Sequence, residues 1–381
     1  MRSRHGWKMA LAALFLLVLV AILRMAPLQV SEPTGPYAVG RTTRIWVDAS
    51  RREVLSTAVG ARQTPVVIWY PAQEGTGSTM PYFPALAKVS SDLVASGELS
   101  ALEVFGLRLA RSQERLDAKM AAGESRYPVV LLSPGNGTNV EFYDAFAGDL
   151  ASHGYIVIGV NHPHDVAAVA LQDGRVAQFI EGPLGFSERE VWTAGRIAER
   201  TADLLFVLAQ LQALNGQGDI LLSGRMELGQ VGVMGHSLGG ITAAQACQAS
   251  EALAACVNLD GLQRGGPFSA DDHPASPRQP FMMITKEKEL PPAQAALFAA
   301  ALSGSYRVVL PAATHDSFTD GPLLQPSLLP NRAEAIASWV RAYSLAFFEQ
   351  TLRGRESALL QQASQGDNVL LEVYTPRQAE R

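Results

Sequence analysis

The sequence predicts an α/β fold in which a mostly parallel central sheet carries helices on both faces. Short apolar runs alternate along the chain with longer segments whose apolar residues recur at helical spacing, which is the pattern of strand–helix–strand units. Several of the short runs are apolar at almost every position, as is typical of strands covered on both faces. With 381 residues, of which 48% are hydrophobic, the chain can bury the core of one large domain with insertions.

The first thirty residues predict a membrane anchor or signal segment, followed by a domain that spans residues 31–381. Three basic residues precede an unbroken apolar run from Met9 to Leu23. As a helix this 15-residue run would be about 22 Å long, shorter than the ~30 Å hydrocarbon layer. No small-residue cleavage site follows, so an uncleaved anchor is favoured over a cleaved signal, and a buried core helix is the third alternative. With an anchor or a signal, we expect the domain outside the cytoplasm, periplasmic or secreted if the segment is cut.

Two strands and a helical insertion are expected at the start of the domain. Thr42–Asp48 alternates between apolar and polar residues, and Pro65–Tyr70 is a continuous apolar run. Residues of about 81–123 precede the third main strand, and their apolar residues recur at helical spacing from Leu86 onward. This helical insertion is expected to be a cap over a pocket, a flap that faces a membrane, or a plain pair of surface helices.

The remaining elements alternate between strand and helix, as crossover connections in a parallel sheet require. The longest helical segment has Ile197, Leu204 and Leu208 on one face. The expected elements are, in chain order, a strand at Tyr127–Ser133, a helix at Asn139–His153, a strand at Tyr155–Val160, a hairpin at Val169–Phe179, a helix at Ser187–Leu214, a strand and a helix on either side of Gly235–Gly240, strands at Ala255–Leu259, Pro280–Thr285 and Tyr306–Leu310, a helix at Pro291–Leu302 and a closing helix at Asn331–Leu352.

The chain is organised around the turn Gly235-His236-Ser237-Leu238-Gly239, which lies between an apolar run and an alanine-rich run. A strand before and a helix after are what G-x-S-x-G needs to form a nucleophile elbow, in which a tight turn exposes the serine oxygen above the sheet. The two outer glycines stand where side chains would collide with neighbouring backbone. Without that context the pentapeptide would be a glycine-rich turn with an ordinary serine. We therefore predict that Ser237 is the nucleophile.

A nucleophilic serine needs a base to take its proton, and the base needs an acid to fix its tautomer. In this arrangement the chain order is serine, acid, histidine, and both partners follow strand ends at the carboxyl edge of the sheet. Asp260 follows the strand after the elbow and His315 follows the last predicted strand, so we predict them as acid and base. Asp316 and Asp320 lie beside His315 and are the substitutes if Asp260 fails. The other histidines precede the serine, lie inside the elbow or follow no strand.

Two backbone amides are expected to bind the negative oxygen of the tetrahedral intermediate. One is the N–H of Leu238, directly after the nucleophile. The other is expected in the turn Pro134–Gly137 at the end of the third main strand, with the amide of Asn136 best placed. The sequence therefore predicts an oxyanion hole formed by Leu238 and Asn136.

No cofactor or metal site is predicted. Asn161–Asp165 contains two histidines and an aspartate but lacks further ligands at metal-binding spacing, so a strand-end loop near the active site is expected there. For Cys247 and Cys256, the only cysteines, we expect two buried thiols, and a disulfide in an oxidising compartment remains the alternative. A net charge of −5 gives no electrostatic case for a nucleic-acid partner.

Seven short motifs carry a resemblance to a known family: Gly-Pro-Tyr-Ala-Val-Gly from Gly35, Val-Val-Ile-Trp-Tyr-Pro-Ala from Val66, Leu-Ser-Pro-Gly-Asn-Gly from Leu132, Leu-Ala-Ser-His-Gly-Tyr-Ile-Val from Leu150, Gly-His-Ser-Leu-Gly-Gly from Gly235, Leu-Asp-Gly from Leu259 and Thr-His-Asp-Ser-Phe from Thr314. With them the chain resembles the α/β-hydrolase family, and within it the branch of platelet-activating factor acetylhydrolase (plasma, type II) and dienelactone-hydrolase-like enzymes. The resemblance runs from about residue 35 to the last helix. One departure is that the family's oxyanion turn often begins His-Gly, whereas Pro134-Gly135 stands here.

The resemblance implies an α/β-hydrolase fold and a metal-free serine esterase with Ser237, Asp260 and His315 as its triad. It implies short-acyl ester substrates, including platelet-activating-factor-like or oxidised phospholipids. The expected function is therefore a carboxylic ester hydrolase that works through an acyl-enzyme. Two alternatives stay open. One is a membrane-anchored binding or scaffold protein on a catalytically silent hydrolase fold, and the other is an acyltransferase, thioesterase or amidase with the same triad.

Overall fold

The computed structural model describes residues 30–56, 60–97, 99–216, 218–261, 278–289, 304–324, 332–361 and 368–374, together with isolated positions 7, 8, 11, 14 and 15. Two expectations from the sequence lie outside the described residues: the anchor or signal segment, apart from those isolated positions and Val30, and the helix at Pro291–Leu302. Among the described residues, no helix combines the length and the hydropathy needed to cross a membrane.

The described strands form one large sheet and a separate hairpin of β7 (Ala168–Ala170) and β8 (Val176–Gln178). The six central strands of the large sheet are parallel, and antiparallel strands flank them on both sides, so the prediction of a mostly parallel sheet is confirmed. From one edge to the other the sheet contains β13 (Leu370–Tyr374), β12 (Ser305–Val309), β11 (Phe281–Thr285), β10 (Leu253–Leu259), β9 (Met226–His236), β5 (Tyr127–Ser133), β6 (Ile156–Val160), β2 (Ala61–Ala72), β1 (Ala38–Arg52), β4 (Arg111–Leu116) and β3 (Ser78–Pro81).

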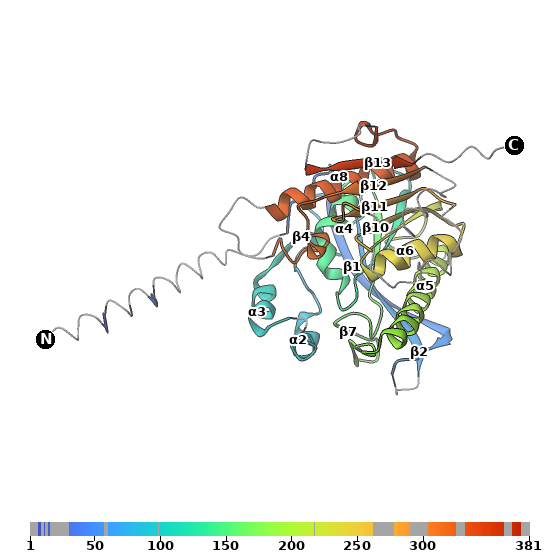
Figure 1. Cartoon of the computed structure of the whole chain (residues 1–381). Helices are drawn as coiled ribbons and strands as arrows, with labels where there is room; N and C mark the ends of the chain where they lie inside the picture. The colour runs from blue at the N-terminus through green and yellow to red at the C-terminus, as the bar shows by residue number, and fades with distance from the viewer. Residues whose placement is uncertain are drawn as a thin grey trace.

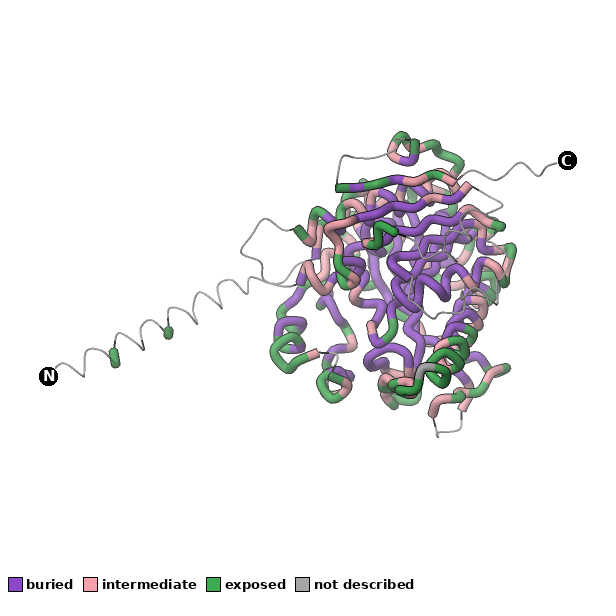
Figure 2. The backbone as a smooth tube through the Cα atoms, viewed as in Figure 1, coloured by how far each residue is buried: buried purple, intermediate pink, exposed green. Residues whose placement is uncertain are grey.

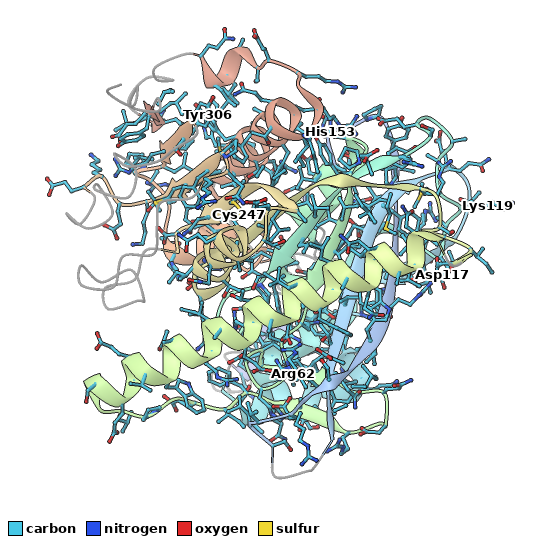
Figure 3. All side chains as sticks on the ribbon, turned by 90° about the vertical axis from the view of Figure 1, so that its right-hand side faces the viewer. Arg62, Asp117, Lys119, His153, Cys247 and Tyr306 are labelled. Atoms are coloured by element: carbon cyan, nitrogen blue, oxygen red, sulfur yellow. A yellow bond between two sulfur atoms is a disulfide. The ribbon has the colours of Figure 1, made fainter. Side chains whose placement is uncertain are left out.

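Helices cover both faces of this sheet (Figure 1). One face carries α4 (Asp144–Ser152), which follows the short 3₁₀ turn η1 (Val140–Tyr143), and α8 (Arg332–Arg353). The other face carries α5 (Phe186–Gly216) and α6 (Leu238–Ala249). In Figure 3 the long helix α5 runs diagonally across this second face, beside α6 with its labelled Cys247.

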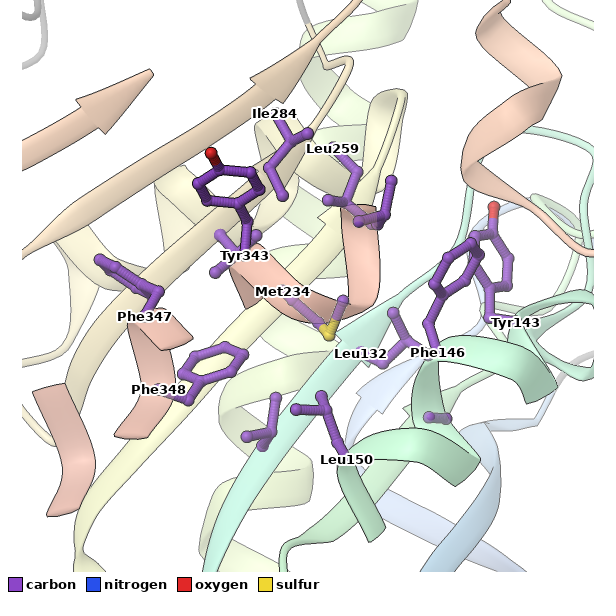
Figure 4. Close-up of a cluster of buried hydrophobic side chains, with 14 of the residues drawn as sticks. Leu132, Tyr143, Phe146, Leu150, Met234, Leu259, Ile284, Tyr343, Phe347 and Phe348 are labelled. Atoms are coloured by element: carbon purple, nitrogen blue, oxygen red, sulfur yellow. The ribbon is translucent and has the colours of Figure 1, made fainter. Parts of the chain in front are cut away.

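Alternate residues of each central strand feed two separate cores. In β5, Val130 and Leu132 pack with the residues of α4 and α8, whereas Val129 and Leu131 pack with those of α5 and α6. Figure 4 shows the first of these cores, where Phe146, Phe347 and Phe348 are among the side chains that meet the sheet. Figure 2 shows that buried residues are concentrated in the central strands of the sheet. Because every position of β5 is buried, the strand has no polar face to expose, as its apolar run predicts.

The insertion between β2 and β5 is only partly helical. It contains α2 (Leu86–Ala95) and α3 (Ala101–Leu109), as the periodicity from Leu86 predicts, and α3 begins with a capping box between Ser100 and Glu103. Residues 111–116, however, form β4, which pairs with β1 and β3 and extends the sheet. The expectation of helix there is wrong because Arg-Ser-Gln-Glu-Arg-Leu has no apolar run, and pairing with an edge strand decides its structure.

The two cysteines form a disulfide that joins α6 to β10, with 6.5 Å between the Cα atoms of Cys247 and Cys256. Both side chains are buried, as the sequence predicts. They are not free thiols, however, and form the disulfide that was the alternative expectation. The burial followed from the apolar surroundings of each residue. The pairing depends on how α6 packs against β10, which the sequence does not specify.

A buried group of acidic side chains connects the insertion, α4 and the segment after His315. Asp320 accepts hydrogen bonds from the amides of Asp144 (2.8 Å) and Ala145 (3.2 Å) at the start of α4 and from the hydroxyl of Tyr82 (2.7 Å). Asp144 also pairs with Arg41 at 3.0 Å. Burial, with the nearby charge of Asp144 as the second cause, raises the pKa of Asp320 to about 7.

Asp320 is expected to make the free energy of unfolding fall as pH rises, and Asp320→Asn is expected to abolish this contribution. Since the pKa of Asp320 is about 7 in the folded state against 3.8 for the free group, the folded protein holds one more proton between these values, and the free energy of unfolding falls across that window. The linkage contribution is on the order of 4 kcal/mol at 1.36 kcal/mol per pKa unit. Urea denaturation from pH 4.5 to 8 measures it, with the exposed acid Asp316 changed to Asn as the control.

The difference between native protein and variant isolates Asp320. The pKa values of His162 and His236 lie below the ordinary value, so these histidines change stability in the opposite direction in both proteins and cancel. Parallel stability curves for the native protein, Asp320→Asn and Asp316→Asn would contradict the assignment.

Candidate active site

The turn between β9 and α6 holds Ser237 in a conformation that few residues other than glycine adopt, with φ 54° and ψ −122°. Its backbone is fixed by a hydrogen bond from its amide to the carbonyl of Leu259 at 2.9 Å. A Cβ atom on Gly235 would lie 2.1 Å from the carbonyl oxygen of Gly239, and one on Gly239 would lie 2.1 Å from that of Ser133. Glycine is therefore required at both positions by the close approach of backbone segments.

The structure brings Ser237, His315 and Asp260 together at the carboxyl edge of the sheet. The Nε2 atom of His315 lies 2.9 Å from the Oγ atom of Ser237, and its Nδ1 atom lies 2.7 Å from the Oδ2 atom of Asp260. The carboxylate accepts from Nδ1–H, which leaves Nε2 free of hydrogen to accept from the serine hydroxyl. The three side chains are thus joined in one directed path from hydroxyl to carboxylate.

The surroundings of Asp260 keep it charged. Its Oδ1 atom accepts a hydrogen bond from the hydroxyl of Thr285 at 2.7 Å, and Lys286 places its Nζ atom 4.0 Å from Oδ2. Burial by itself would raise the pKa of Asp260, but the hydrogen bonds from His315 and Thr285 outweigh it, so the pKa lies below its ordinary value. Neither Asp316, which is exposed, nor Asp320, which is bound to the start of α4, replaces it at His315.

The turn after β5 lies beside the same site, since its residue Asn136 lines a cavity together with Ser237 and His315. The amide of Gly135 donates to the Tyr143 hydroxyl (2.9 Å) and that of Gly137 to the carbonyl of Asp165 (2.8 Å). Between them, the amide of Asn136 donates to no other residue in the described ranges, and neither does the amide of Leu238. Both residues with open amides therefore suit an oxyanion hole.

Residues that the sequence did not identify hold this turn from behind. Arg200, fully buried in α5, donates to the carbonyl of Pro134 at 2.8 Å and to that of Asp165 at 3.2 Å. Its only signal in the sequence was its place on the apolar side of a long helix. A charged side chain buried at that position needs hydrogen-bond acceptors, but the helical spacing of the apolar residues does not identify them.

The histidines of the strand-end loop after β6 are used as hydrogen-bonding groups. The Nδ1 atom of His162 lies 2.9 Å from the Oδ2 atom of Asp203, and its Nε2 atom lies 3.0 Å from the Oγ atom of Ser133. Nδ1 of His164 instead pairs with the carbonyl of Gln178 at 3.0 Å. The loop reaches the oxyanion turn through Asp165 and Ser133.

A cavity of about 580 Å³ opens above the serine. Its wall includes Asn136, Ser237 and His315, and the insertion contributes Leu93 from α2 and Glu103 from α3. The insertion therefore forms one side of the cavity, which favours the cap among its three expected roles. The size suits a small ester or the end of a larger one.

The chain matches known proteins over most of its length. Residues 25–339 match the family model described as platelet-activating factor acetylhydrolase, isoform II. Of the relatives, a probable 1-alkyl-2-acetylglycerophosphocholine esterase of Arthroderma benhamiae is 28% identical over 244 residues, 60% of this chain and 58% of the relative. The platelet-activating factor acetylhydrolase of Cavia porcellus is 27% identical over 281 residues, 68% of this chain and 60% of the relative. The chain thus spans about 60% of the length of these relatives.

Among solved structures, the ferulic acid esterase from Streptomyces cinnamoneus matches with a TM-score of 0.73 and 26% identity, over 91% of this chain and 99% of that chain. With the parallel sheet and its two helical layers, this match confirms the α/β-hydrolase fold expected from the sequence.

Proposed function

The chain belongs to the platelet-activating factor acetylhydrolase, isoform II, family, and from this premise we propose that it is a serine carboxylic ester hydrolase. The observation that carries the proposal is the unbroken path from the Ser237 hydroxyl through His315 to Asp260, with contacts of 2.9 and 2.7 Å. The comparisons support it, because one relative and the matched structure are named as esterases and the other relative as an acetylhydrolase.

In the first half of the reaction, Ser237 attacks the acyl carbon while His315 takes the hydroxyl proton at Nε2. The imidazolium ion that forms is stabilised by the charged carboxylate of Asp260. The carbonyl oxygen becomes negative in the tetrahedral intermediate, and the amides of Leu238 and Asn136 donate to it. His315 then gives its proton to the leaving alcohol, and the acyl-enzyme remains.

In the second half, His315 accepts a proton from water, and the hydroxide that forms attacks the acyl carbon. The same two amides donate to the second tetrahedral intermediate. Its collapse returns the proton to Ser237 and releases the carboxylic acid. Each amide typically contributes about 2.7–4 kcal/mol to lowering the barrier.

Short-acyl esters are the proposed substrates, including platelet-activating-factor-like or oxidised phospholipids. The acetyl group in the names of both relatives supports a short acyl chain. The cavity of about 580 Å³, bounded by insertion residues such as Leu93, has apolar lining for part of the alcohol. A feruloyl ester is the competing substrate, supported by the matched solved structure.

An extracytoplasmic location, with residues 1–30 as an uncleaved membrane anchor, completes the proposal. Its support is the basic start followed by the apolar run Met9–Leu23. The disulfide between Cys247 and Cys256 is a second, independent support, because such bonds persist in oxidising compartments.

Ser237→Ala is expected to abolish labelling by a fluorophosphonate probe and to lower kcat about 10⁴- to 10⁶-fold, since the nucleophile is lost. Ser250→Ala, at the far end of α6, is the control and keeps both properties. Label that persists on Ser237→Ala would overturn the assignment. A native protein without label or turnover would favour the silent binding protein.

Among p-nitrophenyl esters of two to twelve acyl carbons, kcat/KM is expected to be highest for the two- to four-carbon chains. Matched thioester, amide and feruloyl substrates, and an added alcohol acceptor, separate the hydrolase from the thioesterase, amidase and acyltransferase alternatives. A maximum at long chains, or faster cleavage of the feruloyl ester, would contradict the short-acyl proposal.

Removal of residues 1–30 is expected to move the protein from the membrane fraction to the soluble fraction without changing kcat/KM for a soluble ester. Fractionation followed by intact-mass measurement tests this. A full chain that is soluble, or a mature chain that lacks the segment, would contradict the uncleaved anchor.

A further inference from the structure

A buried chain of hydrogen bonds connects the two loops between which the substrate would lie. It begins at the amide of Gly135, which donates to the Tyr143 hydroxyl at 2.9 Å. The hydroxyl lies 2.8 Å from the Nδ1 atom of His236, and the Nε2 atom of His236 lies 3.1 Å from the carbonyl oxygen of His315. Tyr143 and His236 are both buried, and the reaction described above uses neither side chain.

The chemistry of the groups gives this chain one direction. The Tyr143 hydroxyl accepts from Gly135 and has a single hydrogen of its own, which it donates to Nδ1 of His236. With Nδ1 an acceptor, the hydrogen of the neutral imidazole is on Nε2 and is donated to the His315 carbonyl. Burial, and then the proximity of His315, lowers the pKa of His236 to about 3, so the ring stays neutral when His315 becomes charged 4.6 Å away.

The chain fixes the orientation of the peptide group that precedes the Asn136 amide. The Pro134–Gly135 peptide is held at both ends, its oxygen by Arg200 at 2.8 Å and its N–H by Tyr143 at 2.9 Å. Rotation of that peptide would change the direction of the next one, which carries the Asn136 N–H. The position of the Asn136 amide relative to His315 thus depends on the two hydrogen bonds of the Tyr143 hydroxyl and on the imidazole of His236.

We infer that Tyr143 and His236 are positioning residues that hold the oxyanion turn and the backbone of His315 at a fixed separation, so that the Asn136 amide meets the tetrahedral intermediate. This inference rests on the proposed ester hydrolysis. Tyr143 acts through the amide of Gly135 and His236 through the carbonyl of His315, although the His236 ring also lies 4.6 Å from the His315 ring, centroid to centroid. Their effect is on the geometry of the transition state, where small displacements of a donor cost most.

Tyr143→Phe removes only the hydroxyl, and Tyr127, at the start of β5, provides a matched control. The Tyr127 hydroxyl likewise accepts from a backbone amide, that of Glu124 (3.3 Å), and donates to a carbonyl, that of Ala121 (3.0 Å), but it lies at the opposite end of β5. Tyr127→Phe therefore removes an equivalent pair of contacts away from the cavity.

The experiment compares the native protein, Tyr143→Phe, Tyr127→Phe, His236→Phe and the double variant of Tyr143 and His236 in the full chain. Active sites are first titrated with a fluorophosphonate, so that misfolded protein is not counted. For Tyr143→Phe we expect kcat to fall about 10- to 100-fold with KM changed less than about 3-fold. Tyr127→Phe is expected to retain native kcat and KM.

A second readout separates positioning from general loosening. A trifluoromethyl ketone forms a tetrahedral adduct whose oxyanion needs the Asn136 amide, whereas the corresponding secondary alcohol forms none. In Tyr143→Phe the affinity for the ketone should fall by the same factor as kcat, and the affinity for the alcohol should stay native. Because Tyr143 and His236 act in one chain, the double variant should lose no more than the worse single variant.

The outcomes are distinct. Four results would each overturn the inference while leaving the esterase intact. Tyr143→Phe could keep the native kcat, or it could lose no more activity than Tyr127→Phe. The affinities for ketone and alcohol could fall in parallel, or the losses of the two single variants could add in the double variant. Absence of turnover and label in the native protein would instead overturn the proposed function, and the inference with it.

Discussion

The site depends on the contact between the start of α6 and the end of β5. Gly239 lies so near the carbonyls of Ser133 and Pro134 that a methyl group does not fit. This contact fixes the start of α6, with the amide of Leu238, against the turn that carries Asn136, and these are the two amides proposed for the oxyanion hole. Backbone packed against backbone has no rotamers to adjust, so the site inherits its precision from the turn itself.

The polar residues beneath the site extend this constraint outward. Arg200 reaches the turn Pro134–Gly137 from α5. Asp203, one turn further along the same helix, reaches β2 through Arg62 at 2.7 Å and the loop after β6 through His162 at 2.9 Å. Such groups are costly to bury and contribute little net stability, but they accept few alternative arrangements. They fix where the turn lies, while the two apolar cores supply the driving force for folding.

The sequence predicted the central sheet, the family and the placement of Ser237, Asp260 and His315 because each depends on local patterns: apolar runs, glycine at forced turns and polar residues after strand ends. It missed β4, a polar strand held between β1 and β3, and β13, the short edge strand that pairs with β12. The structure of both depends on pairing with neighbouring strands, which the sequence does not specify. It also missed Tyr143 and Arg200. A tyrosine at the end of a short turn and an arginine in a long helix have many ordinary uses, and only the folded chain brings them to the Pro134–Gly135 peptide.

The bond between Cys247 and Cys256 has a topological consequence for the site. Ser237 lies ten residues before the first sulfur, and Asp260 lies four residues after the second. Ser237 and Asp260 therefore lie on the two chain segments that lead into and out of the covalent ring closed between Cys247 and Cys256. The covalent path between them is shortened from 23 residues along the backbone to 14 residues and one disulfide. If thermal fluctuation separates β9 from β10, the segment that must close again is therefore shorter, and its closure costs less entropy.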